Sequence, residues 1–248
     1  DNLKRLSMIS VNPDKRNVFI RKTFDGLKNI QQIVIRGFTN FTFSSIFGDL
    51  QTLEFLTLTQ NHISEFSSGA FLGLKKLKIL DLSNNKIRRL GTGVFGAVCR
   101  EDFTLTCANL THLSKYCDTS YALENLEYLN LEGKHMSFIH HEGFLGCNKL
   151  KSLNLNDNFI GTLDFLYLPQ LLIIQFEKSN IKNYTNTTFI CTPKLTDVSF
   201  HHSYLPSMPL SIFEHLKHLK RLIIFSYKNC DCNFKNIWKW MRNRNVQY

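Results

Sequence analysis

The chain has 248 residues, of which 43% are hydrophobic and 20% are charged, and its formal net charge is +10. This composition is ordinary for a globular protein with a large buried core, and it excludes a disordered or low-complexity chain. No run approaches the roughly 20 apolar residues of a membrane-spanning helix. No secretory signal opens the chain, so we expect a mature or excised fragment.

A pattern of apolar residues recurs along almost the whole chain in steps of 21 to 27 residues. The stretch "LEFLTLTQNHISEF" at 53–66 aligns with "LKILDLSNNKIRRL" at 77–90, and both fit the pattern L-x-x-L-x-L-x-x-N-x-I. We count ten frames, and we expect their strands to begin near residues 3, 30, 53, 77, 100, 126, 150, 171, 195 and 219.

The frame at 100 is inferred from a gap. The frames at 77 and 126 lie about two repeat lengths apart, and one further frame fills the interval. It places four apolar residues on the expected positions: Phe103, Leu105, Leu110 and Leu113.

The pattern resembles the leucine-rich repeat, which implies an α/β-type solenoid (horseshoe) with a parallel sheet on its concave face and an irregular convex side. The repeated leucines are expected to point into the core. Asn61, Asn85 and Asn158 hold the ninth position, where an asparagine bonds backbone groups as the chain leaves the sheet. Phenylalanines near the nineteenth position are expected to stack as an inner spine: Phe24, Phe47, Phe71, Phe95, Phe144, Phe189 and Phe213.

The stretch "CDCNFKNIWKWM" follows the last frame and resembles the C-terminal cysteine cap of extracellular leucine-rich repeat proteins. The resemblance implies a short helix that places Ile237, Trp238 and Met241 on the last repeat. We therefore expect repeats over 1–226 and an incomplete cap over 227–248, within a longer ectodomain.

Cys230 and Cys232 stand too close in sequence to bond to each other without strain. In the resembling family each pairs with a later cysteine, so their partners are expected beyond the chain end. Zinc binding by this pair is the rival interpretation, and it would require two further ligands.

The remaining cysteines and four sequons indicate a secreted or lumenal protein. Cys99 and Cys117 are predicted to form a disulfide. Cys147 and Cys191 are expected to be buried or free rather than bonded to each other. The sequons predict N-glycans at Asn40, Asn109, Asn183 and Asn186.

The outward strand positions carry nearly equal numbers of basic and acidic residues, whereas the loops leaving two of the strands are basic. A lateral site for an anionic ligand is one interpretation, and its histidines would make binding acid-dependent. A solvated surface that only provides solubility is the other. The candidate ligand-binding residues are Lys86, Arg88, Arg89, Lys134, His135, His140 and His141.

No phosphate-binding loop, metalloprotease motif or nucleophile elbow is present, so we expect no enzyme, no metal and no cofactor. His201 and His202 stand next to each other on the concave face and suggest a metal. Adjacent strand residues point to opposite sides, however, which favours surface polar residues.

The irregular repeat lengths, the sequons and the cap together resemble the C-terminal half of a Toll-like receptor ectodomain. That resemblance implies an innate immune receptor that binds a microbial ligand, with nucleic acid as one class for the basic flank, and that dimerises with a receptor partner. It also implies the extracellular or endosomal-lumenal part of a single-pass membrane protein, with no direct membrane contact in this fragment. The alternative is a leucine-rich repeat adhesion or guidance receptor that binds a protein.

Overall fold

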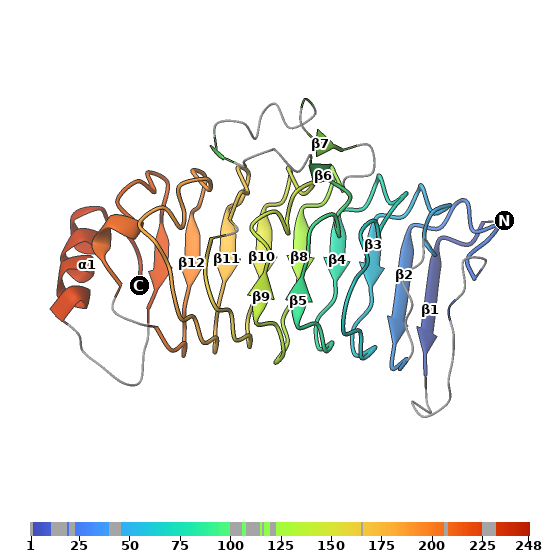
Figure 1. The fold of residues 1–248 in the computed structure, drawn as a ribbon, viewed down its shortest axis with the longest axis horizontal. Coiled ribbons are helices and arrows are strands. Elements are labelled where there is room, and N and C mark those ends of the chain that lie inside the picture. Colours follow the sequence, from blue (N-terminus) through green and yellow to red (C-terminus); the bar gives the residue numbers. More distant parts are fainter. Residues whose placement is uncertain are drawn as a thin grey trace.

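The computed structural model describes residues 2–10, 19, 23–39, 46–99, 106–107, 115, 117–119, 123–164, 166–205, 208–224 and 232–248. The chain winds as a solenoid, and each turn adds one strand to the same long sheet (Figure 1). This architecture confirms the predicted leucine-rich repeat fold.

The main sheet is parallel and contains nine strands among the described residues. Each strand is followed by a loop, a return segment behind the sheet and the next strand, so neighbours in sequence are neighbours in space, apart from the step from β4 to β8. In order across the sheet the strands are β1 (Arg5–Ile9), β2 (Gln32–Arg36), β3 (Phe55–Thr57), β4 (Ile79–Asp81), β8 (Tyr128–Asn130), β10 (Ser152–Asn154), β11 (Ile173–Gln175), β12 (Asp197–Ser199) and β13 (Arg221–Ile223).

The repeated leucines explain why the turns stack. Leu56, Leu80 and Leu129 pair in register on β3, β4 and β8, and each is fully buried. Burying one leucine side chain contributes about 2 kcal/mol to folding. A single turn cannot bury its leucines alone, so the free energy comes from contact between turns.

The prediction that a strand beginning near residue 100 joins the main sheet is wrong. Strand β4 pairs directly with β8, because the Tyr128 N–H donates to the Lys78 carbonyl at 3.0 Å and the Leu82 N–H to the Asn130 carbonyl at 2.9 Å. These bonds leave no place for a strand between them. The four apolar residues that suggested the frame, Phe103, Leu105, Leu110 and Leu113, lie outside the described residues.

We call residues 98–122 the insertion, because their described strands stand apart from the main sheet. Their described ends form β6 (Val98–Cys99) and β7 (Cys117–Asp118), an antiparallel pair separate from the main sheet. Figure 1 shows this pair beyond the upper edge of the sheet, opposite the edge where β5 (Arg89–Leu90) and β9 (Phe138–Ile139) lie.

The predicted ladder of asparagine side chains is present, and serines extend it beyond the last asparagine. Asn85 accepts hydrogen bonds from the N–H groups of Asn61 and Ile63 at 2.9 and 3.1 Å, and it donates to the Leu58 carbonyl at 2.7 Å. Further along, Ser179 and Ser203 occupy the same position. The Ser179 hydroxyl accepts from the Asn158 N–H at 3.3 Å, and the Ser203 hydroxyl from the Ser179 N–H at 3.0 Å.

The predicted phenylalanine spine forms in the return segments. Phe47 and Phe71 stack with ring centroids 6.4 Å apart, and Phe95 continues the stack at 6.0 Å from both Phe71 and Phe144. All four rings are buried. Their stacking holds the return segments at the same spacing from turn to turn.

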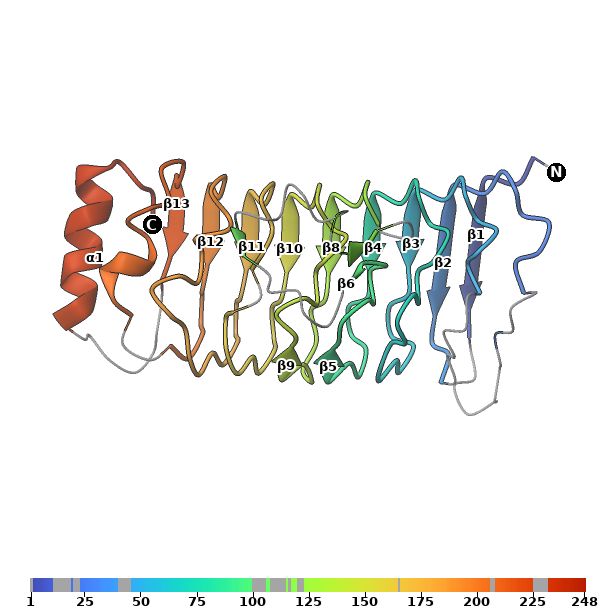
Figure 2. The same ribbon diagram turned by 45° about the horizontal axis from the view of Figure 1, so that its top comes forward.

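Helix α1 (Cys232–Asn243) packs against the last turn at one end of the solenoid (Figure 2). Ile237 and Met241 are buried as expected. Trp238 is 40% exposed and rests against Tyr248, at 4.7 Å between ring centroids. It lines a small hollow together with Leu222 and Ile224 of the last turn, so it lies at the edge of the predicted contact. After the helix the Gln247 N–H donates to the Lys220 carbonyl at 2.7 Å, which extends the sheet by one bridge.

None of the helices in the described ranges has the length and apolar character needed to cross a membrane.

The ladder predicts a large effect for Asn85→Ala. The substitution leaves buried backbone groups of two turns without partners, so we expect a loss of about 3 kcal/mol in the free energy of unfolding. Asn85→Ser should cost less, because serine serves the same position at Ser179. Urea unfolding of each variant measures the difference. Asn148→Ala, at an exposed asparagine, is the matched control, and equal midpoints for control and Asn85→Ala would contradict the prediction.

Candidate functional site

The outward face of the main sheet neutralises its own charge. Acidic and basic side chains alternate on neighbouring strands and form ion pairs: Lys78–Glu54 at 2.8 Å, Lys151–Glu127 at 2.8 Å and Arg221–Asp197 at 2.7 Å. The hydrogen bond and charge of Lys151 hold the pKa of Glu127 below its usual range, with Lys78 adding to the effect. Three cations on this face, Lys78, Lys151 and Arg221, are therefore already paired, which weakens their attraction for an anionic ligand.

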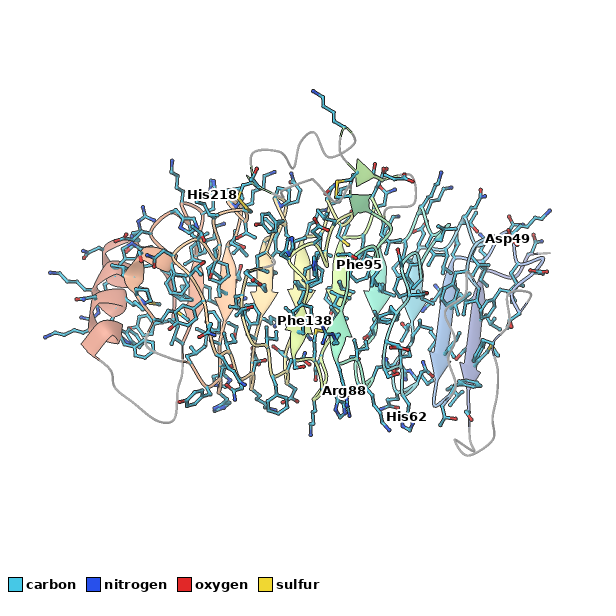
Figure 3. The ribbon with its side chains drawn as sticks, viewed as in Figure 1. Asp49, His62, Arg88, Phe95, Phe138 and His218 are labelled. Atoms are coloured by element: carbon cyan, nitrogen blue, oxygen red, sulfur yellow. A yellow bond between two sulfur atoms is a disulfide. The ribbon has the colours of Figure 1, made fainter. Side chains whose placement is uncertain are left out.

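The loops that leave β4 and β8 bring the predicted basic residues together. Strand β5 pairs with β9 in parallel, and the Arg88 carbonyl accepts from the N–H groups of Ser137 and Phe138 at 3.0 and 3.3 Å. Figure 3 shows Arg88 at the lower edge of the solenoid, on the same edge as His62 and below Phe138. We call this edge the basic flank, made of Lys86, Arg88, Arg89, Lys134, His135, His140 and His141.

The direct pairing of β4 with β8 is what makes the flank compact. The register of β4 on β8 continues into that of β5 on β9, so Lys86 and His135 occupy equivalent positions on adjacent turns. A strand from the frame at 100 would have separated the two loops by one turn. All the flank residues except His140, which is half-buried, are exposed.

An exposed aromatic ring lies within the basic flank. The Arg89 guanidinium sits 4.6 Å from the centroid of the Phe138 ring, which is 41% exposed. Such a cation–π contact contributes on the order of 0.5–1 kcal/mol at an exposed site. It holds the guanidinium of the exposed Arg89 beside the ring. Phe138 was not among the residues predicted from the sequence. Its position opposite Arg89 follows only once the two loops are known to be adjacent.

His140 and His141 form the second part of the flank. Their ring centroids are 4.2 Å apart, and the Glu142 N–H donates to Nδ1 of His140 at 3.2 Å. Burial, followed by the neighbouring His141, lowers the pKa of His140, while Glu142 and Asp164 act in the opposite direction. His140 therefore gains its proton only when the pH falls below the ordinary range for histidine.

Within the described residues, His140, His141 and Glu142 are a group whose donor atoms lie close enough to consider a metal, all within 4.8 Å of one another. Nδ1 of His140 accepts the Glu142 N–H, so the neutral ring carries its proton on Nε2. A metal would need that nitrogen without its proton. The arrangement therefore favours hydrogen bonding over metal binding.

His201 and His202 were expected to be strand residues that point to opposite sides, and this expectation is wrong. They follow the end of β12 at Ser199. His202 has a φ of 57°, which turns the chain, and the two rings face each other with centroids 3.8 Å apart.

The edge that carries the flank continues toward a glycosylation sequon. The Gly161 N–H donates to the Ser137 carbonyl at 3.3 Å, and the Asn183 N–H donates to the Gly161 carbonyl at 2.9 Å. Asn183 thus stands in the same row as Arg88, three turns further along. Asn183 and Asn186 are both exposed, as a glycan requires, while Asn40 and Asn109 lie outside the described residues.

Two disulfides fasten the insertion. One joins Cys99 to Cys117, the pair expected from the sequence, across β6 and β7. The other joins Cys107 to Cys191, 84 residues away in sequence. Cys191 is therefore buried and bonded to Cys107, whereas Cys147 is buried and free, so the two are not bonded to each other, as expected. Cys230 and the side chain of Cys232 fall outside the described part, and their pairing stays a prediction.

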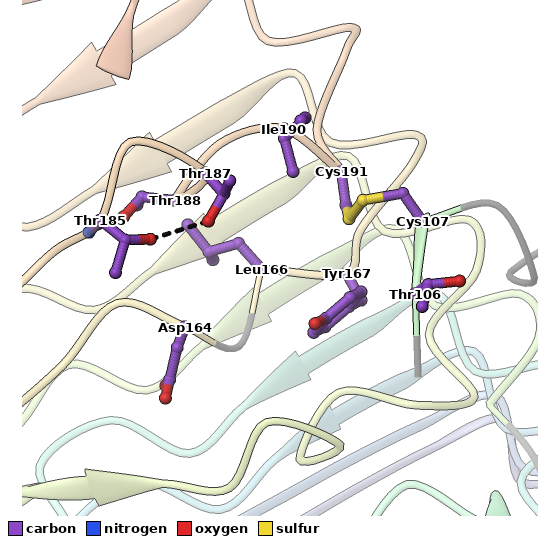
Figure 4. Close-up of a pocket in the computed structure, with 10 residues that line it drawn as sticks. All are labelled: Thr106, Cys107, Asp164, Leu166, Tyr167, Thr185, Thr187, Thr188, Ile190 and Cys191. Carbon is purple, nitrogen blue, oxygen red and sulfur yellow. Dashed lines mark hydrogen bonds between the residues drawn. A yellow bond between two sulfur atoms is a disulfide. The ribbon is translucent and has the colours of Figure 1, made fainter. Parts of the chain in front are cut away.

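A cavity of about 370 Å³ lies between the insertion and the return segments of two turns (Figure 4). Its size is at the lower end of the range of about 300–1,000 Å³ for small-molecule sites. The cavity could not be predicted from the sequence, because Cys107 and Cys191, which both line it, are 84 residues apart. Its lining includes Thr106, Cys107, Asp164, Leu166, Tyr167, Thr185, Thr187, Thr188, Ile190 and Cys191.

Comparisons with known proteins agree with this architecture. The family model for the leucine rich repeat matches residues 36–87 and 51–97, and the model for the BspA type leucine rich repeat region matches residues 117–236. The chain belongs to the leucine-rich repeat family.

Within that family the chain resembles part of a Toll-like receptor ectodomain. It is 30% identical to Toll-like receptor 3 of Bos taurus over 192 residues, which is 73% of this chain and 19% of the receptor. The chain therefore spans about a fifth of the length of this curated relative.

Two solved structures share the fold. A TLR13–ssRNA13 complex matches with a TM-score of 0.67 and 23% identity, over 90% of this chain and 29% of the other. The Drosophila Toll–Spatzle complex matches with a TM-score of 0.66 and 18% identity, over 88% of this chain and 26% of the other.

The surroundings of His140 in the basic flank predict how its pKa responds to a substitution. His141→Gln removes one of the two causes that lower the pKa of His140, so we expect this pKa to rise while burial keeps it below its usual value. Because the folded chain binds this proton less readily than the unfolded chain, the stability that His140 contributes should fall as the pH drops below about 6.5. NMR titration of the imidazole signals measures the shift. His135→Gln serves as the control, and an unmoved His140 signal in His141→Gln would contradict the prediction.

Proposed function

We propose that the chain is the ligand-binding part of an innate immune receptor of the Toll-like type, and that it acts by binding and not by catalysis. The observation that carries this proposal is the basic flank, where cations from two adjacent turns gather around an exposed aromatic ring. The family resemblance supports the same role. The solenoid offers a wide surface, which suits a large ligand.

The ligand that fits the flank is anionic, and a nucleic acid satisfies its chemistry best. Lys86, Arg88 and Arg89 supply positive charge, and a base stacks on an exposed ring such as Phe138. The structural neighbour that contains single-stranded RNA agrees with this ligand class. On the outward face of the main sheet, three basic side chains form ion pairs with acidic ones, which makes that face less attractive to such a ligand than the basic flank.

Acid should strengthen this binding. His140 becomes positively charged only below the ordinary pKa of histidine, because burial lowers its pKa. Three acidic groups lie near the flank, namely Glu65 in the preceding turn, Glu142 and Asp164. They are negative at neutral pH and offset part of the positive charge. Protonation of His140 then shifts the balance toward an anion, which fits an endosomal-lumenal location better than a neutral extracellular one.

We infer that binding is linked to dimerisation with a second receptor chain, as the resemblance implies, and that the ectodomain belongs to a single-pass membrane protein. The alternative, an adhesion or guidance receptor with a protein ligand, is weaker. The relative that matches 73% of the chain is a Toll-like receptor.

The proposal predicts that RNA and DNA oligonucleotides bind the full chain more tightly at pH 5.5 than at pH 7.4, and less tightly as salt rises. A triple variant with Lys86→Glu, Arg88→Glu and Arg89→Glu should lose this binding. For a single strand the slope of log K against log salt should fall by about 2, since each lost phosphate contact removes about 0.7. Fluorescence anisotropy across a salt series measures both quantities.

A matched triple variant carries the same charge change on the opposite edge, in the exposed loops that lead into the strands: Lys75→Glu, Lys76→Glu and Lys217→Glu. Its binding should stay within a few fold of the unaltered chain. Equal losses in the two variants would mean that net charge alone attracts the oligonucleotide. Absence of binding at both pH values would remove nucleic acid as the ligand and favour a protein partner.

A further inference from the structure

The cavity beneath the insertion has a polar end and an apolar end (Figure 4). At the polar end lie Asp164, Thr185 and Thr187, and the hydroxyls of the two threonines are 2.8 Å apart. At the apolar end lie Ile190 and the Cys107–Cys191 disulfide. Tyr167 lies at the disulfide end, where it packs against the cluster that contains Cys191. Burial raises the pKa of the Tyr167 phenol, so this phenol stays protonated and able to donate a hydrogen bond.

The polar end begins beside a glycosylation sequon. Asn183 forms a parallel bridge with Thr162 on the preceding turn, and the Leu163 N–H donates to the Asn183 carbonyl at 3.1 Å. The Thr162 hydroxyl in turn donates to the Asp164 carboxylate at 3.2 Å. Asp164 lies two residues after Thr162, and Thr185 lies two residues after Asn183. Both Asp164 and Thr185 line the cavity. Residues two apart in an extended segment point to the same side, so a group attached to Asn183 is on the side of the segment from which Thr185 lines the cavity.

The second sequon points elsewhere. Oδ1 of Asn186 accepts a hydrogen bond from the Ser211 hydroxyl at 3.0 Å, and Ser211 belongs to the following turn. The cavity instead lies toward the preceding turn and the insertion. Asn186 is thus close to Asn183 in sequence but directed away from the cavity, which makes it a natural internal comparison.

We propose that the cavity seats the first sugar of an N-linked glycan carried by Asn183. The chemistry of the lining matches a pyranose. The Asp164 carboxylate and the threonine hydroxyls accept hydrogen bonds from sugar hydroxyls, and the Tyr167 ring packs against the apolar C–H face of a sugar. The seated sugar bridges the return segments of two turns, next to the disulfide that holds the insertion.

This inference does not depend on the receptor function; it requires only passage through the secretory pathway. There a transferase joins the side-chain nitrogen of Asn183 to C1 of the sugar of a lipid-linked oligosaccharide. The lipid pyrophosphate leaves as the C1–O bond breaks, and the amide nitrogen loses one proton.

The experiment measures how fast an amidase that cleaves the glycan–asparagine bond releases each glycan from the folded protein. The full chain is expressed in animal cells, treated in heavy-oxygen water and digested, and mass spectrometry reports labelled aspartate at positions 183 and 186. We expect release at Asn183 to be about tenfold slower than at Asn186, the factor for one hydrogen bond to a charged group. After denaturation the two rates should be equal.

Two alanine variants test the named contacts, and a valine variant is compared with them. Asp164→Ala and Tyr167→Ala should each bring release at Asn183 close to the rate at Asn186, whose rate should not change and which reports that the variants remain folded. Thr187→Val keeps the Asn186 sequon and should accelerate release at Asn183 less than Asp164→Ala does. The proposal is overturned if Asn183 carries no glycan, if the two sites are released equally fast in the unaltered chain, or if slow release persists in both variants.

Discussion

The hydrogen bonds between successive turns are the interaction on which the rest of the structure depends. Each strand satisfies its backbone only by pairing with its neighbours, and each turn buries its leucines only against the next one. The ladder of side chains formed by Asn61, Asn85 and Asn158 adds a second set of bonds that cross between turns. Because these bonds fix the register, a residue at a given position of one turn lies beside the equivalent residue of the next. Surface chemistry is therefore arranged in rows.

This regularity is why the sequence predicts most of the fold. The leucine spacing is sufficient to place nine strands, since a buried residue in a stacked turn has few alternatives. The phenylalanine spine follows by the same reasoning, as Phe71 and Phe95 show. Ser179 and Ser203 were harder to recognise, because one hydroxyl replaces the amide and the pattern was defined by asparagine alone. Trp240 was not singled out, because two tryptophans stand near the helix face, and only the packing shows that Trp240 also contacts the core.

The insertion marks the limit of such reasoning. Apolar spacing alone does not distinguish a strand of the solenoid from a segment that leaves it, and the interval between the frames at 77 and 126 happened to equal two repeats. The bond between Cys107 and Cys191 joins parts of the chain that are distant in sequence, so no local pattern reveals it. The basic residues of the flank could be identified from the sequence, but their proximity in space could not be predicted. It depends on the adjacency of β4 and β8, which pair directly, while the described strands of the insertion, β6 and β7, form a separate pair.

The same insertion therefore shapes two separate surfaces. On the edge where the strands end, its departure brings Arg88 and Arg89 beside Phe138 and the histidines. On the return side, its attachment to Cys191 encloses a cavity lined by Asp164 and Tyr167. Asn183 lies at the junction, in the row of the flank and at the rim of the cavity. A glycan that projected freely from Asn183 would cover part of the edge between Asn183 and the basic flank. A glycan held in the cavity is drawn toward the return side instead, which leaves the basic flank open to a large anionic ligand.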